Sequence, residues 1–231
     1  MRISTGSEEL DSMLDRSVQG GQVYELYGHS GTGKTQLCLT SSARCLARGG
    51  NVVYIDTKGD FSADRFLQIY NSISDKKHNV TDIDLTRFKY CEARTGYSLQ
   101  ECCHMVSNMN QNIHLIIIDN ISLPLMTPVV DGDIHSAITT GSTISQLLHK
   151  TAAVRNCAVI LVSNLKSVNN DLMNYEPEPA LGAVWNSAAN VRLLMTRISD
   201  KNIEACVTRG AKTSQKCSVT IDKTGLTDIK R

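Results

Sequence analysis

The chain has 231 residues, of which 41% are hydrophobic and 20% are charged, and its formal net charge is +1 at pH 7. This composition is typical of a soluble globular protein that can bury an ordinary core. The near-neutral charge excludes a global field that attracts nucleic acid or membranes, and no apolar run approaches the ~20 residues that span a bilayer.

Short apolar runs alternate with helical patterns through the first half of the chain. The helical spacing of apolar residues that begins at Lys34 stops at Gly49 and Gly50, as at a helix C-terminus, and Ser62 is a typical N-cap residue. These patterns predict strands over 23–27, 52–55 and 87–93 and helices over 34–46, 63–73 and 99–106.

The second half begins with two buried strands on either side of a long helix. Residues 115–118 and 158–162 are unbroken apolar runs, as strands covered on both faces of a sheet require, and 135–156 has a helical pattern. After Trp185 the pattern predicts strands with little helix between them, over 191–195, 203–208 and 218–221.

The order of these elements predicts an α/β fold. Repeated strand and helix imply a mostly parallel, twisted sheet with helices on both faces, and the late strands extend one end of it as an antiparallel edge. We expect a single domain that covers residues 1–231.

The cysteines and the N-terminal residues indicate the compartment. Eight cysteines are scattered without a C-x-x-C pair or a spacing typical of zinc. Glu8, Glu9 and Asp11 exclude the apolar region of a secretory signal. We therefore expect an intracellular protein whose cysteines are small core residues, with a metal or disulfide role as the alternative.

A glycine-rich loop between the first strand and the first helix carries a phosphate-binding motif. It matches G-x-x-x-x-G-K-[ST] with the residues Gly28, His29, Ser30, Gly31, Thr32, Gly33, Lys34 and Thr35. Glycines let backbone N–H groups turn toward phosphates, and the following helix directs its positive end at the same anion. Lys34 is expected on the β- and γ-phosphates and Thr35 on Mg²⁺, whereas His29 is a variable position. The motif predicts an ATP site.

Asp119 ends the buried strand at 115–118. A carboxylate at the tip of a strand beside the phosphate loop is where a second anchor for Mg²⁺ belongs. The alternative is a cap after a core strand. Given the loop, we predict that Thr35 and Asp119 form the metal site.

Several segments of the chain resemble the RecA-type recombinases, in particular the paralogues that assist the eukaryotic strand-exchange protein, and among these the type lettered D. These segments are residues 3–11, 33–38 and 54–57 and residues 179–182 followed by Trp185. The resemblance extends from residue 2 to about 225 and implies a RecA-like P-loop NTPase core that binds ATP. It also implies that Gln36, next to the loop, and Arg65, against the adenine, belong to the ATP site.

The chain departs from the recombinases at two positions with known roles in that family. The catalytic glutamate that activates water is replaced by Lys58, which cannot accept a proton, so no catalytic residue is predicted and hydrolysis is expected to be weak or dependent on a partner. The glutamine that reports the γ-phosphate is replaced by Leu165. The family's N-terminal DNA-binding domain and its subunit-linking motif also have no counterpart before residue 3.

The resemblance implies two mobile DNA loops, at Pro124–Asp133 and Lys166–Pro179, but neither is rich in basic residues. From Arg192 to Arg231, nine lysines and arginines face four acidic residues, which indicates either a solvated edge or a surface for DNA or a partner. Arg209 and Lys212 are candidates for reaching a neighbour's γ-phosphate. The candidate contact residues are Lys166, Arg209, Lys212 and Lys216. Trp185 is expected to pack in the core rather than stack on a base.

The leading hypothesis is an ATP-binding accessory subunit in homologous-recombination DNA repair. We expect it in the nucleus, in a complex with other recombinase paralogues or with the recombinase itself, on single-stranded DNA and not on a membrane. Alternatives are an autonomous DNA-dependent ATPase that exchanges strands, a short archaeal-type recombinase relative, and a ring-forming ATPase of the circadian-clock or helicase type.

Overall fold

The computed structural model describes residues 1–73, 86–130, 132–166, 177–181, 185, 188–210 and 212–229. The helices in this part of the chain are α1 (Glu8–Met13), α2 (Lys34–Ala47), α3 (Ala63–Ile73), α5 (Gly96–Asn108), α6 (Ser122–Val130) and α7 (Ile134–Arg155). The strands are β1 (Arg2–Ile3), β2 (Val18–Gln19), β3 (Val23–Tyr27), β4 (Val52–Asp56), β5 (Phe88–Glu92), β6 (Leu115–Asp119), β7 (Ala158–Ser163), β8 (Val191–Arg197), β9 (Asn202–Arg209), β10 (Lys216–Asp222) and β11 (Gly225–Asp228).

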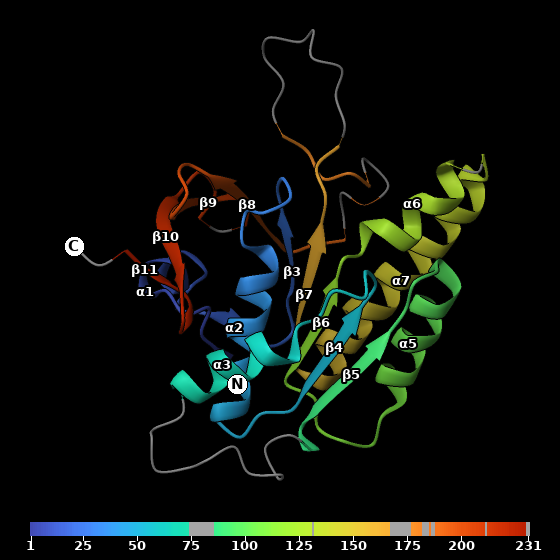
Figure 1. Cartoon of the computed structure of the whole chain (residues 1–231). Helices are drawn as coiled ribbons and strands as arrows, with labels where there is room; N and C mark the ends of the chain where they lie inside the picture. Colours follow the sequence, from blue (N-terminus) through green and yellow to red (C-terminus); the bar gives the residue numbers. More distant parts are fainter. Residues whose placement is uncertain are drawn as a thin grey trace, which may run out of the picture.

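Nine strands form one sheet in the order β11-β10-β9-β8-β3-β7-β6-β4-β5 (Figure 1). The six strands from β8 to β5 are parallel, and β9, β10 and β11 continue the sheet in antiparallel fashion. The predicted parallel sheet with an antiparallel C-terminal edge is therefore confirmed. From β3 the chain crosses to β4 and the edge strand β5, returns through β6 to β7, the neighbour of β3, and then crosses to β8 on the other side of β3. The carboxyl end of β3 is thus a topological switch point, where ligands of open α/β sheets bind.

The central strands β3, β4, β6 and β7 are buried at every position because each face of the sheet is covered by helices. On β6, Leu115 and Ile117 pack in one cluster with α1, α2 and α3, whereas Ile116 and Ile118 pack in a second cluster with α5, α6 and α7. Successive side chains on a strand point to opposite faces, so an unbroken apolar run feeds both cores. Trp185 is 2% exposed in the second cluster, which agrees with the predicted packing role.

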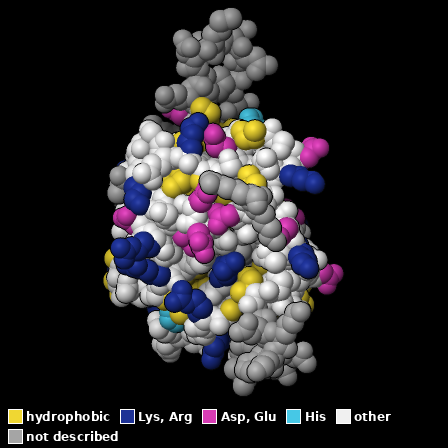
Figure 2. Space-filling model, turned by 90° about the vertical axis from the view of Figure 1, so that its left-hand side faces the viewer, with side chains coloured by type: hydrophobic (Ala, Val, Ile, Leu, Met, Phe, Trp, Pro, Cys, Tyr) yellow, Lys and Arg dark blue, Asp and Glu magenta, His cyan; other side chains and the backbone are white. Residues whose placement is uncertain are grey.

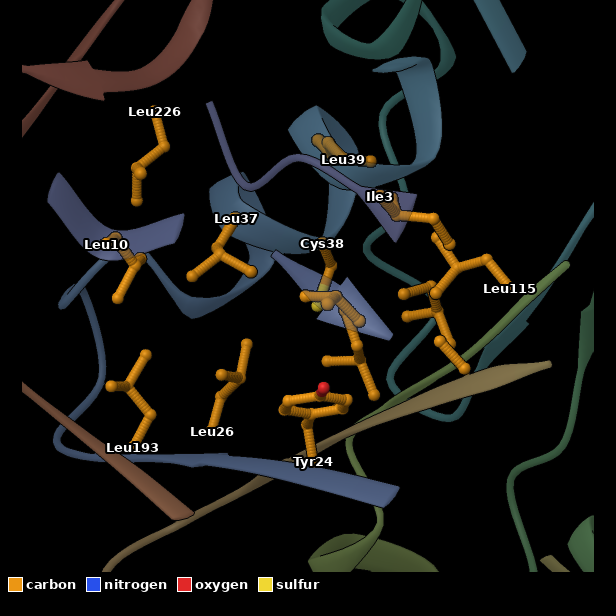
Figure 3. Packing of buried hydrophobic residues seen from close by; sticks show 14 of the residues in the cluster. Ile3, Leu10, Tyr24, Leu26, Leu37, Cys38, Leu39, Leu115, Leu193 and Leu226 are labelled. Carbon is orange, nitrogen blue, oxygen red and sulfur yellow. The ribbon is translucent and has the colours of Figure 1, made fainter. Parts of the chain in front are cut away.

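The first cluster fixes α2 and therefore the loop before it. Figure 3 shows Leu37 of α2, Leu10 of α1 and Leu226 of β11 on one side, and Leu193 of β8 and Leu26 of β3 on the other. Each of these five side chains is at most 3% exposed. Six of the eight cysteines are also buried, as expected of small core residues.

Five elements differ from the sequence expectations, namely β1, β2, α1, α6 and β11. The short strands β1 and β2 pair over two residues each, which is too short for a periodic pattern. Helix α1 begins at the N-cap Ser7, whose hydroxyl accepts a hydrogen bond from the Leu10 N–H at 3.0 Å. The expected loop at Pro124–Asp133 is wrong over Pro124–Val130, which lies in α6; Pro124 is tolerated there because it occupies the first turn.

Two features named from the sequence lie partly outside the described residues. The segment expected as the second DNA loop is described only at 166 and 177–179, where Leu165 forms a bridge with Pro179. Gly182 also lies outside the described residues.

Candidate nucleotide-binding site

The glycine-rich loop joins β3 to α2 at the switch point of the sheet. A Cβ at Gly28 would lie 2.2 Å from the Met195 carbonyl oxygen, so only glycine fits between β3 and β8. Gly33 is the N-cap of α2 with φ 86°, and no side chain caps this helix. The first N–H groups of α2 and the positive end of its dipole are therefore directed at the loop, which is the arrangement that binds phosphate.

Lys34 lies inside the loop. Its ammonium donates hydrogen bonds to the carbonyl oxygens of Gly28 at 2.7 Å and His29 at 2.6 Å, and it lies 3.3 Å from Thr32 Oγ1. Burial lowers the pKa of Lys34 to about 8, while the Asp119 carboxylate acts in the opposite direction. A desolvated ammonium held only by carbonyl dipoles is strongly attracted to an anion.

Thr35 and Asp119 are brought together as the sequence predicted. The Thr35 hydroxyl donates to Asp119 Oδ2 at 2.6 Å, and the Tyr54 hydroxyl donates to the same oxygen at 3.2 Å. Asp119 is 1% exposed. A buried carboxylate next to a hydroxyl is a donor set that fits Mg²⁺.

Lys58 also reaches this carboxylate. Its Nζ lies 3.2 Å from Asp119 Oδ1 and 3.0 Å from Asp60 Oδ2. Burial alone would lower the pKa of Lys58, but the carboxylates of Asp119 and Asp60 raise it above its usual value. The residue at the expected glutamate position is thus a charged donor. Asp60 does point toward the site, but its carboxylate is paired with Lys58.

The turn that carries Lys58 is organised by a residue that sequence reasoning missed. The Asp56 carboxylate, at the end of β4, accepts hydrogen bonds from the N–H groups of Lys58 and Gly59 at 2.9 Å and of Phe61 at 3.0 Å. Asp56 pairs with Asp119 across β4 and β6, which brings the turn beside the tip of β6. The signal for it was a carboxylate followed three residues later by Gly59, a typical turn pattern.

A cavity of about 560 Å³ lies over the loop. Its lining includes the loop residues 30–35 and Gln36, Lys58 and Asp60. It also includes Asn120, Asn164 and Arg197, which sequence reasoning missed. The amide of Asn120 donates to Asn164 Oδ1 at 2.8 Å, and Arg197 donates to the Gly31 carbonyl. All three follow or end strands at the carboxyl edge of the sheet, and that position was the only available signal.

Arg65 lies beside this cavity and contacts the predicted Gln36. Its Nε donates to Gln36 Oε1 at 2.8 Å, and its Nη2 donates to the Asp222 carbonyl at 2.6 Å. The guanidinium therefore joins α3 to α2 and to the end of β10. Gln36 lines the cavity, and Arg65 is related to the cavity through its hydrogen bond to Gln36.

The basic candidate residues do not converge on the loop. Lys166, Lys212 and Lys216 lie 3.8, 3.8 and 3.0 Å from carboxylate oxygens of Glu178, Asp15 and Glu204. Figure 2 shows basic and acidic side chains interspersed over one face of the molecule rather than a uniformly basic surface.

Arg209 and Lys212 lie at the opposite end of the sheet from the phosphate loop. On β9, Ile203 pairs with Arg197, which contacts the loop, and Arg209 pairs with Arg192 six residues along the strand. At about 3.4 Å per residue this separation is roughly 20 Å. Within one chain these residues cannot reach a nucleotide on the loop.

The family profile described as Rad51 matches residues 1–229. The chain belongs to the Rad51 family. None of the helices among its described residues is long and apolar enough to cross a membrane.

Relatives within the Rad51 family come from eukaryotes and archaea. The chain is 26% identical to "DNA repair protein RAD51 homolog 4" of Bos taurus over 235 residues, which cover 95% of this chain and 70% of the relative. It is 28% identical to "DNA repair and recombination protein RadB" of Thermoplasma acidophilum over 214 residues, which cover 90% of this chain and 85% of the relative. These names support a role in recombinational DNA repair.

The same RecA-like fold is found in a solved member of the family. The structure titled "Crystal structure of the RadB recombinase" superimposes with a TM-score of 0.82 and 22% identity, covering 99% of this chain and all of the other. The mixed sheet with helices on both faces and antiparallel C-terminal strands is therefore the family fold. The family and fold imply nucleotide binding.

Proposed function

We propose that the chain is an ATP-binding accessory subunit in homologous-recombination DNA repair. The observation that carries the proposal is the loop itself: Lys34 and the uncapped start of α2 form a phosphate site, and Thr35 and Asp119 meet beside it. The nucleotide would be ATP, held by residues 28–36 with Arg65 behind them. Mg²⁺ would be held by Thr35 and Asp119 and would neutralise phosphate charge.

An accessory role is supported by what Lys58 replaces. A general base must accept a proton from the attacking water, and the ammonium of Lys58 can only donate. Asp60, the nearest alternative, is paired with that ammonium at 3.0 Å. Binding without efficient hydrolysis suits a subunit that assists another ATPase, and any substantial turnover would need residues from a partner.

The partners we propose are other recombinase paralogues, with single-stranded DNA contacted mainly through the complex in the nucleus. The similarity to proteins named RAD51 homolog 4 and RAD51 homolog 3 supports this assignment, and a paralogue of the type lettered D remains our proposal for the subtype. The pairing of Lys166, Lys212 and Lys216 with acids supports weak DNA contact by the chain alone.

A short archaeal-type recombinase relative is the second candidate. It is favoured by coverage, because RadB of Methanococcoides burtonii is matched over 97% of its own length, against 70% for the bovine relative. The proteins that co-purify with the chain distinguish the two candidates, because a paralogue subunit would be isolated together with other paralogues.

The first test measures nucleotide binding. We expect Lys34→Ala to weaken binding of a fluorescent ATP analogue by at least about 100-fold, because a buried, charge-assisted contact to phosphate is lost. Lys150→Ala, on the exposed side of α7, removes the same charge far from the loop and serves as the control. If Lys34→Ala bound the analogue as tightly as the parent chain, the assignment of the nucleotide site to this loop would be wrong.

The second test concerns the accessory role. The tagged protein is purified from its own cells under conditions that preserve complexes, and co-purifying proteins are identified by mass spectrometry. Stoichiometric recombinase paralogues are the expected result. A homogeneous assembly of this chain alone, active in strand exchange, would contradict the accessory role and favour an autonomous recombinase.

A further inference from the structure

Lys58 lies where the site would hold a metal cation. Its ammonium is 3.2 Å from Asp119 Oδ1 and lines the same cavity as Lys34 and Thr35. We propose that Lys58 supplies part of the positive charge that Mg²⁺ would supply to a bound nucleoside triphosphate, so that nucleotide binding depends only weakly on Mg²⁺. This rests on the proposed function, because it concerns the same nucleotide site.

The two oxygens of Asp119 have different surroundings. Oδ2 accepts hydrogen bonds from the hydroxyls of Thr35 and Tyr54, whereas Lys58 is the cation at Oδ1. Mg²⁺ binds its oxygen ligands at about 2.0–2.1 Å and demands near-ideal octahedral geometry. A metal ion that uses Oδ1 must therefore displace the ammonium from it.

Displacement of Lys58 is opposed by the way it is held. Its own N–H is fixed by Asp56, and its ammonium is anchored a second time by Asp60 at 3.0 Å. Gly59, the next residue, has φ 75°, a backbone conformation that glycine adopts readily and other residues rarely adopt. The ammonium therefore has a defined position in the site.

Charge repulsion acts in the same direction. Lys34 and Lys58 already place two positive groups around the cavity, and a divalent ion would be a third in a partly desolvated space. Two ammonium groups can neutralise phosphate oxygens as Mg²⁺ does, although without its coordination geometry. The expected outcome is a site that keeps its affinity for nucleotide and has a lowered affinity for the metal.

The test compares nucleotide affinity in excess Mg²⁺ and in excess EDTA, using a fluorescent ATP analogue. For the parent chain we expect EDTA to weaken binding by less than about threefold. Lys58→Met removes the ammonium and keeps the apolar stem, and for this variant we expect EDTA to weaken nucleotide binding by more than about tenfold. Lys58→Arg should retain the behaviour of the parent, and Lys150→Met on α7 is the matched control for a lost surface charge.

A second readout reports the metal directly. Paramagnetic resonance measures the affinity of Mn²⁺ for the protein–nucleotide complex, and we expect Lys58→Met to bind Mn²⁺ at least about tenfold more tightly than the parent. A thermal melt of each variant establishes that it is folded.

The outcomes separate the two proposals. If EDTA weakens nucleotide binding by the parent chain more than about tenfold, the role proposed for Lys58 is wrong. The same holds if EDTA changes the affinity of Lys58→Met and of the parent equally. In both cases the proposed ATP binding stands. The parent measurement decides this even if Lys58→Met fails to fold. If the parent binds the analogue in neither condition, the proposed function itself is wrong.

Discussion

At the scale of single residues, Lys58 determines what the site can do. Its ammonium lies beside Asp119 and Asp60, where the fold positions a side chain after β4 close to the phosphate loop. A carboxylate in the same place could accept a proton from water. The chemistry of the whole cavity therefore depends on one side chain whose backbone is fixed by Asp56.

We predict that Lys58→Glu raises the rate of ATP hydrolysis of the isolated chain by about 10²-fold or more, because a positioned general base contributes roughly 10²–10⁴. Steady-state phosphate release in Mg²⁺ measures the effect. Lys58→Met is the control that removes the ammonium without supplying a base. An equal rise in both variants would show that the lysine inhibits in another way, and parent activity at the level of Lys58→Glu would refute our interpretation of this position.

The phosphate loop could be predicted at this scale because spacing along the chain fixes its residues. Asp119 could be paired with Thr35 because a carboxylate that ends a buried strand beside such a loop is where a second anchor for Mg²⁺ belongs. The ion pair of Lys58 with Asp119 could not be predicted, since it joins residues 61 positions apart across two strands. Asn120 and Asn164 were also missed. Each follows an apolar strand as any polar residue does, and only their mutual contact at 2.8 Å distinguishes them.

At the scale of elements, a buried ion pair joins the neighbouring parallel strands β3 and β8. Arg192 of β8 donates through Nε to Glu25 Oε2 of β3 at 2.7 Å, and Glu25 also accepts a hydrogen bond from Ser163 of β7 at 2.8 Å. Glu25 is fully buried, and burial raises its pKa although Arg192 and Ser163 lower it. Arg192 further donates to the Trp185 carbonyl at 3.0 Å.

We predict that Arg192→Leu lowers the free energy of unfolding by about 3–5 kcal/mol, because it leaves the Glu25 carboxylate buried without its cation. The double variant Glu25→Leu with Arg192→Leu should recover most of this loss, since an apolar pair of similar volume is often neutral. Urea unfolding followed by circular dichroism measures both. A double variant as unstable as Arg192→Leu would show that the loss comes from packing or from the Trp185 contact.

The sequence predicted the central strands correctly because burial on both faces leaves continuous apolar runs such as 115–118. It did not predict α6 over Pro124–Val130, where the family resemblance had implied a loop. It also missed the strand character of β11, whose four residues acquire their pairing only through β10. The partner of Glu25, which lies in the middle of a buried strand, could not be predicted from the sequence, because Arg192 is 167 residues away.

At the scale of the whole molecule, the charges of the C-terminal half are balanced by the N-terminal half. The excess of basic residues after Arg192 is a property of the linear sequence, but folding brings α1 with its acids Glu8, Glu9 and Asp11 against β10 and β11. Lys212 contacts the Ser12 carbonyl and lies 3.8 Å from Asp15. The local excess is therefore partly neutralised in three dimensions, as the mixed surface in Figure 2 illustrates.

We predict from this balance that the isolated chain binds single-stranded DNA weakly and that rising salt abolishes the binding, because neutralised phosphates drive both affinity and its salt dependence. Charge reversal to Glu at Arg209, Lys212 and Lys216 together should weaken this residual binding several-fold more than the same reversal at Arg2, Lys89 and Lys150. The control set changes the net charge equally, so a difference reports the location of the contact. Fluorescence anisotropy of a labelled oligonucleotide over a series of salt concentrations measures both sets. Tight binding by the parent chain at physiological salt would contradict the expectation that DNA is contacted mainly through a complex. Equal effects of the two sets would show that the contact surface lies elsewhere, and the phosphate-loop end of the sheet, roughly 20 Å from Arg209, would be the next region to test.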